Sequence, residues 1–299
     1  MKILVTGASG SLGGELVKTL KLRVPGAEIL TPLRSEVDLS DTVNCHRYLE
    51  YVKPTHVYHL AGTVYGIHGN KVHPEKAILD NSLIDYSLFS GLFKFPPKWI
   101  FYASTVATYG FPFHKKALHE NDWLIGDPHE SEFGYAMAKR HARSYLEVIH
   151  KVFGTEFSYG LLTNLFGTGD RYMNGKGHVI VSLLHKGAEA AKQDKQLEVW
   201  GNEESSRDFL STRDAAELLA DLLGIHTGVV NIASGQEVLI SEIVDHVVSK
   251  YKVFKGYRFI GENSGIQSRV SSIELIRNFT SRVDEIDSRK RIANFIITY

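Results

Sequence analysis

Tyr135 and Lys139 are the two residues of this chain whose types and spacing suggest chemistry most directly. They begin and end the run YAMAK, and a helix there places side chains four residues apart on one face. A phenol with a pKa near ~10 is a poor proton donor or base at neutral pH, but a neighbouring ammonium favours the phenolate and lowers that pKa. Proton exchange with a carbonyl or an alcohol then becomes feasible. The same spacing also occurs in plain pairs on a helix surface.

Thr105 ends the apolar run 98–105, which we predict to be a central strand. In an open α/β sheet, groups at the carboxyl ends of the strands are well placed for chemistry. The hydroxyl of Thr105 can donate or accept a second hydrogen bond at the oxygen that Tyr135 serves. With Lys139, these residues form a candidate group for proton transfer.

The first strand and turn of the chain give this group its context. Residues 3–6 are apolar or β-branched, three glycines follow at a spacing of three, and helical periodicity begins at Leu12. In such a turn Gly7 permits the tight bend, Gly10 lets the backbone approach a pyrophosphate, and Gly13 lets the helix pack close to the strand.

The helix N-terminus after this turn would hold the phosphates of a dinucleotide on its unpaired amides. Glycine-rich turns are common, so the pattern alone is weak, but its place between a strand and a helix favours dinucleotide binding over a plain structural turn. The candidate cofactor contacts in the turn are Gly7, Ser9, Gly10, Leu12 and Gly13.

The second strand, predicted over residues 28–34, ends in Arg34 rather than in an acidic residue. In dinucleotide folds a carboxylate there binds the adenosine ribose, whereas an arginine accommodates a 2′-phosphate. Arg34 therefore favours NADP(H) over NAD(H), with a solvated surface arginine as the alternative. Pro32 indicates that the strand ends early or bends. Asp38 could accept a hydrogen bond from the adenine amino group, and Asp41 could equally cap a helix.

A third predicted strand, 56–60, runs into small residues, as a flat ring passing over the backbone would require. The candidate cofactor contacts here are Leu60, Ala61 and Gly62. The glycines and the aromatic residue of the loop 63–70 suit a substrate-facing loop, with Val64 and Tyr65 as contacts. The alternative is an ordinary connection with one buried aromatic residue.

The two histidines of this region, His59 and His68, are expected to pack or to form hydrogen bonds. Neither has a carboxylate or a cysteine at the spacing of a metal site. No metal site is therefore predicted.

The order of strands and helices loosens after the strand predicted over 157–167. We predict an α/β fold, with a Rossmann-type doubly wound parallel sheet and a smaller C-terminal α/β substrate-binding lobe. The NADP-binding Rossmann domain is expected over residues 1–165 with later returns near 207–234, and the substrate lobe mainly over 166–299.

Two arginines of the second half are candidates for phosphate contacts from their positions. His178 lies near the N-terminus of a predicted helix, and Arg207 lies beside a predicted strand. Arg207 could clamp a diphosphate bidentately, or it could form a salt bridge with Asp208 or Asp214. Arg269, in the polar tail, is a further candidate phosphate ligand.

The composition narrows the classes of partner and compartment. The 34 basic residues balance the 34 acidic ones, so neither nucleic acid nor a membrane surface is expected as a partner. Cys45 is the only cysteine, which excludes an internal disulfide. No apolar run reaches about 18 residues, and the first residues lead straight into a strand without a secretory pattern. A cytoplasmic setting is expected.

Six motifs together carry a family resemblance. They are TGASGSLG at 6–13, HLAG at 59–62, STVATYG at 104–110, YAMAK at 135–139, TNLFG at 163–167 and RDFLSTRD at 207–214. With them the chain resembles the extended short-chain dehydrogenase/reductase family of nucleotide-sugar enzymes, also called the NAD-dependent epimerase/dehydratase family, along nearly its whole length. Within it the chain is most similar to the GDP-L-fucose synthases, which epimerise and reduce GDP-4-keto-6-deoxymannose.

The resemblance implies roles for the catalytic group. Tyr135 would protonate the C4 ketone, Lys139 would tune Tyr135 and hold the nicotinamide ribose, and Thr105 would complete the triad. Asn164 and Leu165 would lie between the nicotinamide and the sugar.

The resemblance also implies substrate contacts. His178 would be the catalytic histidine of its helix, and Lys186, Arg207 and Arg269 would hold the nucleotide diphosphate. The family typically pairs through a four-helix contact that would include the Tyr135 helix, so a homodimer is expected.

The stretch around residues 106–107 departs from the relatives. Ala107 stands where fucose synthases have their epimerising cysteine, and Val106 and Ala107 stand where 4,6-dehydratases carry an Asp-Glu pair. Neither side chain can move a proton, and epimerisation at C3 or C5 needs acid-base groups beside those carbons. The leading prediction is an NADP(H)-dependent 4-keto-sugar reductase. The alternatives are a C4 epimerase or dehydrogenase that retains its cofactor, and a non-catalytic nucleotide-binding protein.

Overall fold

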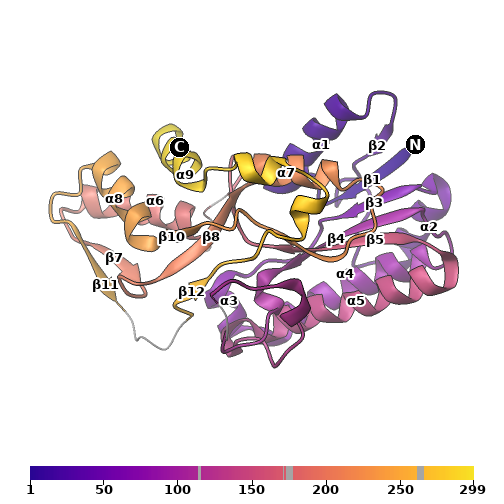
Figure 1. Ribbon diagram of the computed structural model, residues 1–299, viewed down its shortest axis with the longest axis horizontal. Helices are drawn as coiled ribbons and strands as arrows, with labels where there is room; N and C mark the ends of the chain where they lie inside the picture. Colours follow the sequence, from indigo (N-terminus) through magenta and orange to yellow (C-terminus); the bar gives the residue numbers. More distant parts are fainter. Residues whose placement is uncertain (114–115, 171, 173–177, 261–265) are drawn as a thin grey trace.

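The computed structural model describes residues 1–113, 116–170, 172, 178–260 and 266–299, and only the backbone of residues 67 and 68. The predicted packing role of His68 therefore lies outside the described side chains. Figure 1 shows a larger part that contains both the first strands and the long helices, and a smaller part beside it.

The larger part is built on a six-stranded parallel sheet with the strand order β2-β1-β3-β4-β5-β9. Its strands are β1 (Lys2–Thr6), β2 (Glu28–Leu30), β3 (His56–His59), β4 (Trp99–Thr105), β5 (Glu156–Leu162) and β9 (Gly228–Ile232). The chain moves outward from β1 to β2 and then back past β1 to β3. Ligands of such sheets bind at the carboxyl ends of the strands where the order reverses. The predicted parallel α/β fold is confirmed.

Helices cover both faces of this sheet (Figure 1). Alternate residues of β1 point to opposite faces, so Ile3 and Val5 pack with α1 (Ser11–Arg23) and α7 (Thr212–Asp221). Leu4 packs on the other face. The helices there are α2 (Thr42–Val52), α4 (Pro74–Leu92) and α5 (Phe133–Phe153). The inner strands are largely buried on both sides, in keeping with their apolar sequences, whereas the edge strand β2 is exposed or half-buried.

The smaller part has its own apolar core. Its helices are α6 (Val179–Lys192), α8 (Ile240–Tyr251) and α9 (Ser288–Thr298), and its strands are β6 (Asn164–Phe166), β7 (Leu197–Trp200), β8 (Ser206–Ser211), β10 (Glu237–Leu239), β11 (Tyr257–Ile260) and β12 (Ser268–Arg269). β8 is paired with β6, β10 and β12, and β7 is paired with β11. The predicted C-terminal α/β lobe is therefore present.

One local prediction needs correction. The segment 63–70, predicted as a loop, contains the start of a short helix, α3 (Gly66–Val72). It packs compactly because Gly69 lies against Tyr65, where an added Cβ would be 2.8 Å from the tyrosine Cβ. Near the C-terminus, residues 288–298 form α9. As Pro32 indicated, the second strand ends early, at Leu30.

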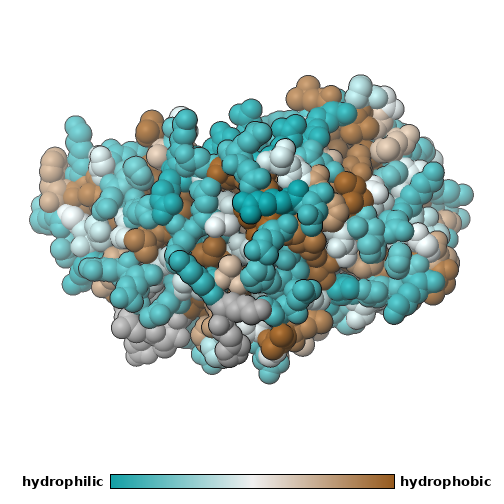
Figure 2. Space-filling model, in the orientation of Figure 1, coloured by the Kyte–Doolittle hydropathy of each residue, from teal (hydrophilic) through white to brown (hydrophobic). Residues whose placement is uncertain are grey.

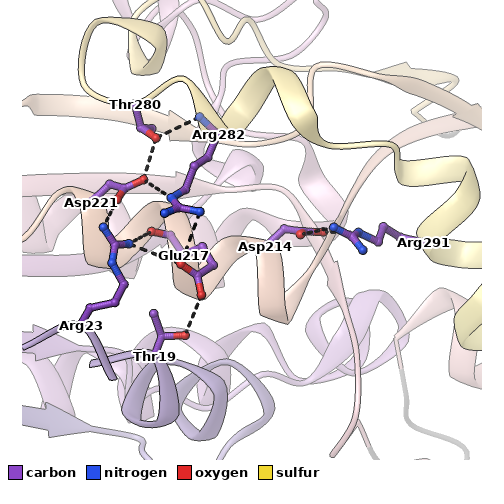
Figure 3. A network of polar contacts seen from close by, with 8 residues as sticks. All are labelled: Thr19, Arg23, Asp214, Glu217, Asp221, Thr280, Arg282 and Arg291. Atoms are coloured by element: carbon purple, nitrogen blue, oxygen red, sulfur yellow. Dashed lines mark hydrogen bonds and ion pairs between the residues drawn. The ribbon is translucent and has the colours of Figure 1, made fainter. Parts of the chain in front are cut away.

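A polar network joins α1, α7 and the C-terminal segment (Figure 3). Asp221 accepts hydrogen bonds from Arg23 and from Thr280 (2.6 Å), and Arg282 lies 3.2 Å from the same carboxylate. Arg291 of α9 pairs with Asp214 at 3.0 Å. These contacts hold the end of the chain against the Rossmann helices.

The face seen in Figure 2 is mainly hydrophilic, with small groups of hydrophobic residues between charged ones. Within the described ranges, no helix is both long enough and apolar enough to cross a membrane.

Candidate active site

The glycine turn has the geometry that the sequence predicted. Gly7 has a φ of +73°, and an added Cβ would lie 2.8 Å from the Ala61 nitrogen. At Gly13 an added Cβ would lie 2.2 Å from the Gly7 carbonyl oxygen. Helix α1 therefore begins directly against the strand, with Gly10 as its N-cap. The first amides of a helix are available to a ligand, so this end suits a pyrophosphate.

Ser11, which the sequence reasoning missed, fixes a second segment over this turn. Its hydroxyl donates to the Thr168 carbonyl (3.0 Å), and an added Cβ on Gly169 would lie 3.6 Å from its Cα. Ser9 is exposed, while Leu12 is partly buried against the core. The segment around Thr168 therefore borders the predicted phosphate site.

Arg34 and Asp38 lie side by side just beyond β2. The Arg34 side chain is 85% exposed, and its Nε lies 3.8 Å from an Asp38 carboxylate oxygen. Hydrogen bonds from Ser40 are the main cause that lowers the pKa of Asp38, and Arg34 adds to it. Asp41, the alternative helix cap, accepts from the Asn44 amide (3.1 Å) at the start of α2. The predicted adenosine contacts thus form one charged pair.

Lys139 brings the candidate catalytic group to the candidate cofactor segment. It is 3% exposed, and an added Cβ on Gly62 would lie 3.3 Å from its Nζ. Ala61, the preceding residue, donates its amide to Thr6 Oγ1 (3.2 Å). The Lys139 ammonium also lies 4.8 Å from the centre of the Tyr102 ring. Lys139, predicted for catalysis, therefore lies next to Gly62, predicted for cofactor binding.

Tyr135 corrects one part of the sequence argument. Lys139 was expected to lower the pKa of Tyr135. In the structure, burial raises the pKa of Tyr135, and the carboxylates of Glu132 and Asp85 act in the same direction. A raised pKa keeps the phenol protonated at neutral pH. Protonated phenol is the form that can donate a proton to a ketone.

The two hydroxyl residues at the end of β4 have different environments. Ser104 is 3% exposed and donates to the Tyr159 hydroxyl (2.7 Å), so it belongs to the core. Thr105 Oγ1 accepts from the Ala107 amide (3.1 Å), which leaves its own proton to donate elsewhere. Thr105 therefore remains the candidate for the reacting oxygen.

Asn164, Leu165 and His178 lie on the side of the smaller lobe. Asn164 and Leu165 are partly buried in β6, and the Asn164 amide donates to the Asp208 carbonyl (3.0 Å). His178 is the exposed N-cap residue of α6. Burial raises the pKa of Asp170, and the nearby His178 acts to lower it. His178 is therefore a neighbour of Asp170.

Arg207 and Arg269 are adjacent in parallel strands, because they are register partners of β8 and β12. Arg269 is 7% exposed and donates to Glu132 (2.7 Å), the residue three before Tyr135. Arg207 donates to the carbonyls of Ser206 (2.6 Å) and Gln267 (3.1 Å). Burial, and then Arg269, lower the pKa of Arg207 to about 10.

The salt bridges considered for Arg207 are replaced by other contacts. Asp208 accepts from the amides of Ser234 and Gly235, both at 3.0 Å, and Asp214 pairs with Arg291. Burial is the main cause that raises the pKa of Asp208 to about 6. The guanidinium of Arg207 is therefore directed by backbone carbonyls.

Lys186 lines a cavity of about 820 Å³ at the far side of the smaller lobe. Trp200, which sequence reasoning missed, lines it too and is 74% exposed. Arg258 lines this cavity as well, but Arg207 and Arg269 do not. The three predicted diphosphate ligands therefore divide between two places.

The two predicted contacts of the loop after β3 also differ. Val64 is 58% exposed. The Tyr65 hydroxyl donates to Asp80 of α4, and this hydrogen bond is the main cause that raises the pKa of Tyr65 to about 12. Tyr65 is therefore tied to α4 in this conformation.

His150, Glu156 and His226 are the described residues that could together hold a metal ion. Glu156 is the first residue of β5, at the end opposite the candidate site. The Phe157 amide donates to His226 Nδ1 (3.2 Å), and His150 Nδ1 lies 3.0 Å from the Thr155 carbonyl. His226 Nδ1 also lies 2.6 Å from a Glu156 carboxylate oxygen, so these three residues form a polar cluster at the edge of the sheet.

The chain is similar in sequence and in fold to known proteins. A GDP-L-colitose synthase of Yersinia pseudotuberculosis is 28% identical over 95% of this chain and 94% of its own. The structure of a GDP-6-OMe-4-keto-L-xylo-heptose reductase from C. jejuni is similar with a TM-score of 0.89, at 20% identity over 99% of this chain and 96% of that one. A GDP-L-fucose synthetase from Naegleria fowleri, bound to NADP, is similar with a TM-score of 0.83, at 23% identity over 99% of this chain and 92% of that one.

The sequence model of one family matches residues 3–233, from β1 through β9. The matched range contains the glycine turn, Tyr135 and Lys139. This chain belongs to the NAD dependent epimerase/dehydratase family.

Proposed function

We propose that the chain is an NADP(H)-dependent reductase that converts a GDP-linked 4-keto sugar to the C4 alcohol. The observation that carries the proposal is the position of Lys139, whose Nζ lies against the Gly62 backbone while Tyr135 stands one turn before it on α5. A proton donor is thereby held beside the expected nicotinamide. The named activities of the similar GDP-sugar enzymes support this class of substrate.

The residues at the end of β1 fit a dinucleotide. The spaces at Gly7 and Gly13 cannot hold a Cβ without backbone movement, since added atoms would lie 2.8 Å or less from backbone atoms. Such a turn lets a pyrophosphate approach the amides of α1, and Ser9, Gly10 and Leu12 complete the turn. A bound nicotinamide supplies the hydride for C4.

NADP(H) is proposed over NAD(H) because of Arg34. Its exposed guanidinium lies just beyond β2, where an adenosine 2′-phosphate is expected. The Asp38 carboxylate lies 3.8 Å from the Arg34 Nε and would accept a hydrogen bond from the adenine amino group. The NADP bound to the similar fucose synthetase supports the same choice.

Proton transfer is assigned to the side chains of this chain. Tyr135 donates its proton to the C4 oxygen as the alkoxide forms, and Thr105 donates a hydrogen bond to the same oxygen. The buried Lys139 ammonium stabilises the resulting phenolate and holds the nicotinamide ribose. Leu60, Ala61 and Gly62 would line the place of the nicotinamide ring, and Asn164 and Leu165 would border the space where the ring and the sugar meet.

The substrate would contact two cationic places in the smaller lobe. Arg207 and Arg269 are proposed to hold the diphosphate, because arginine binds phosphate bidentately. Lys186 lines the 820 Å³ cavity with the exposed Trp200, and that indole offers a face on which a base can stack. Val64 and Tyr65 would border the sugar.

C3 and C5 epimerisation are proposed to be absent. Val106 and Ala107 are 2% and 4% exposed and carry no proton. His178 would then contact the sugar as the remaining acid-base residue, and one such residue cannot serve both faces of the ring.

A homodimer is proposed through α4 and α5. Leu79, Leu83 and Tyr86 follow helical spacing on α4 and are 44–65% exposed. Val148 and Val152 repeat the pattern on α5 at 48% and 63%. Adjacent exposed apolar faces suit a self-complementary contact. The domain division at residues 165 and 166 and a cytoplasmic setting remain proposals.

The test is turnover with NADPH and GDP-4-keto-6-deoxymannose in heavy water, followed by NMR of the product. Stoichiometric loss of NADPH, with no deuterium at C3 or C5 beyond that which the substrate exchanges alone, is the expected result. Turnover without added NADPH would instead indicate a C4 epimerase with retained cofactor. Deuterium at C3 or C5 would overturn the loss of epimerisation.

A further inference from the structure

A buried carboxylate lies beneath the candidate active site, and the mechanism above does not use it. Asp85 of α4 is 1% exposed. One of its oxygens accepts from the Tyr102 hydroxyl (2.7 Å), and the other lies 3.0 Å from His59 Nε2. Burying a carboxylate costs free energy unless an opposite charge and hydrogen bonds compensate it, so Asp85 depends on its neighbours for stabilisation.

The hydrogen bonds around His59 have one consistent direction. Burial lowers the pKa of His59, so the imidazole is neutral and carries one proton. Ionised Asp85 only accepts, so that proton lies on Nε2 and donates to it. Nδ1 must then accept from the Thr6 hydroxyl at 2.7 Å, and Thr6 Oγ1 accepts from the Ala61 amide. The neutral His59 supplies a hydrogen bond to Asp85 but no positive charge.

The positive charge close to Asp85 is that of Lys139. The Lys139 Nζ lies 4.8 Å from the centre of the Tyr102 ring, the same ring whose hydroxyl binds Asp85. Burial lowers the pKa of Lys139, and Asp85 acts to raise it. Ammonium and carboxylate are thus held near one aromatic ring in a region of low dielectric, where charges interact strongly.

Other titratable groups surround the pair from each packed element. Tyr159 of β5 stacks on Tyr102 with ring centres 5.5 Å apart and donates to the Lys139 carbonyl. Glu132, before α5, acts on Tyr135. The pKa of Lys139 responds to burial and to Asp85.

We propose that Asp85 is a positioning residue that supplies the negative charge opposite Lys139. Tyr102 and His59 fix the Asp85 carboxylate by hydrogen bonds, and His59 is linked through Thr6 to the Ala61 amide of the candidate cofactor segment. The expected effect of Asp85 on catalysis rests on the proposed function. Its effect on the charge of Lys139 can be measured from cofactor binding alone. Asp85 acts through Lys139 and does not touch the substrate.

The test replaces Asp85 by a neutral residue of the same shape, in Asp85→Asn. NADPH affinity, measured by fluorescence from about pH 6 to about pH 10, should match the unmodified protein at low pH. As the pH rises, the NADPH affinity of Asp85→Asn should fall at a pH about one unit lower than that of the unmodified protein, because Lys139 loses its proton at a lower pH. The alkaline limb of kcat/KM should move by the same amount.

Two variants separate charge from packing. Ser87→Ala removes a buried hydroxyl of the same helix, bonded to Thr42 at 2.9 Å, and should leave both pH profiles in place. If Asp85→Asn alone does not fold, adding His59→Gln lets two side-chain amides form a hydrogen bond with each other and should show the same shift. An affinity loss equal at every pH, or unchanged profiles, would overturn the role of Asp85. Because NADPH binding is measured without sugar, a failed reductase assay does not decide this result.

Discussion

Glu132 and Arg269 form a buried ion pair of 2.7 Å that joins the smaller lobe to the turn before α5. Glu132 is 9% and Arg269 7% exposed, and Tyr135 follows Glu132 by three residues. The strand that carries one predicted diphosphate ligand is therefore bound to the segment that positions the proton donor. Arg269 Nε is, among the described side chains, a buried donor without a partner.

Breaking this pair should destabilise the protein strongly. Arg269→Gln leaves Glu132 buried without its cation, which costs about 3–5 kcal/mol of unfolding free energy. Urea unfolding measures the change. The double variant with Glu132→Gln should recover much of the loss, since two neutral amides replace an isolated charge. A double variant as unstable as Arg269→Gln would show that the pair contributes through shape rather than charge.

The same pair predicts a pH dependence. Burial acts to raise the pKa of Glu132, but Arg269 outweighs it and the folded-state pKa is lowered. The folded chain then binds fewer protons than the unfolded one, so this stabilisation is present above the unfolded pKa of about 4.3 and is lost as pH falls through the folded value. The difference in unfolding free energy between the unmodified protein and Glu132→Gln should therefore shrink below about pH 4.3. A constant difference would contradict the assignment.

Gly13→Ala should abolish cofactor binding. Its Cβ would lie 2.2 Å from the Gly7 carbonyl oxygen, so α1 must move away from the turn. Gly14→Ala is the matched control, because its Cβ would meet the Ala8 oxygen at 3.7 Å, an ordinary contact. The control should bind NADPH normally and gain up to about 1 kcal/mol of stability from helix propensity. Equal binding by both variants would exclude the predicted phosphate site.

Arg34→Ala should weaken NADPH binding by about 10- to 100-fold, as expected for a lost charge-assisted contact of about 1.5–3 kcal/mol. NADH binding should change little, because that cofactor has no 2′-phosphate. Arg47→Ala, at an exposed arginine of α2, is the control for net charge. If both cofactors weaken equally, Arg34 does not select between them.

Tyr135→Phe should lower kcat by about 10²- to 10⁴-fold, the usual contribution of a positioned acid. Cofactor affinity should stay within about threefold, since the ring and Lys139 remain. Tyr145→Phe on the same helix, whose ring stacks on Phe89, is the control and should keep its activity. Retained turnover in Tyr135→Phe would support a different proton donor.

Sequence predicted the features that depend on neighbours along the chain. The tight turn at Gly7 and the close approach at Gly13 follow from local geometry on one strand and one helix. Arg34 was singled out from its place after the second apolar run, although the strand itself ends at Leu30.

Contacts between distant residues were not predictable in the same way. Ser11 and Thr168 are 157 positions apart, and Glu132 and Arg269 are 137 apart, so no local pattern connects them. The pKa of Tyr135 was predicted in the wrong direction for the same reason, because its burial, the main cause of the raised pKa, arises only when the chain folds. Trp200 carries no motif of its own and is identified by the cavity that it lines.

The return of β9 to the large sheet has an evolutionary consequence. The chain crosses to the smaller lobe after β5, comes back in β9 beside β5, and leaves again for β10 and α8. The substrate lobe is therefore not one continuous cassette that recombination could exchange in a single step. A lineage with this topology must change its sugar preference by substitutions and loop insertions within a shared frame.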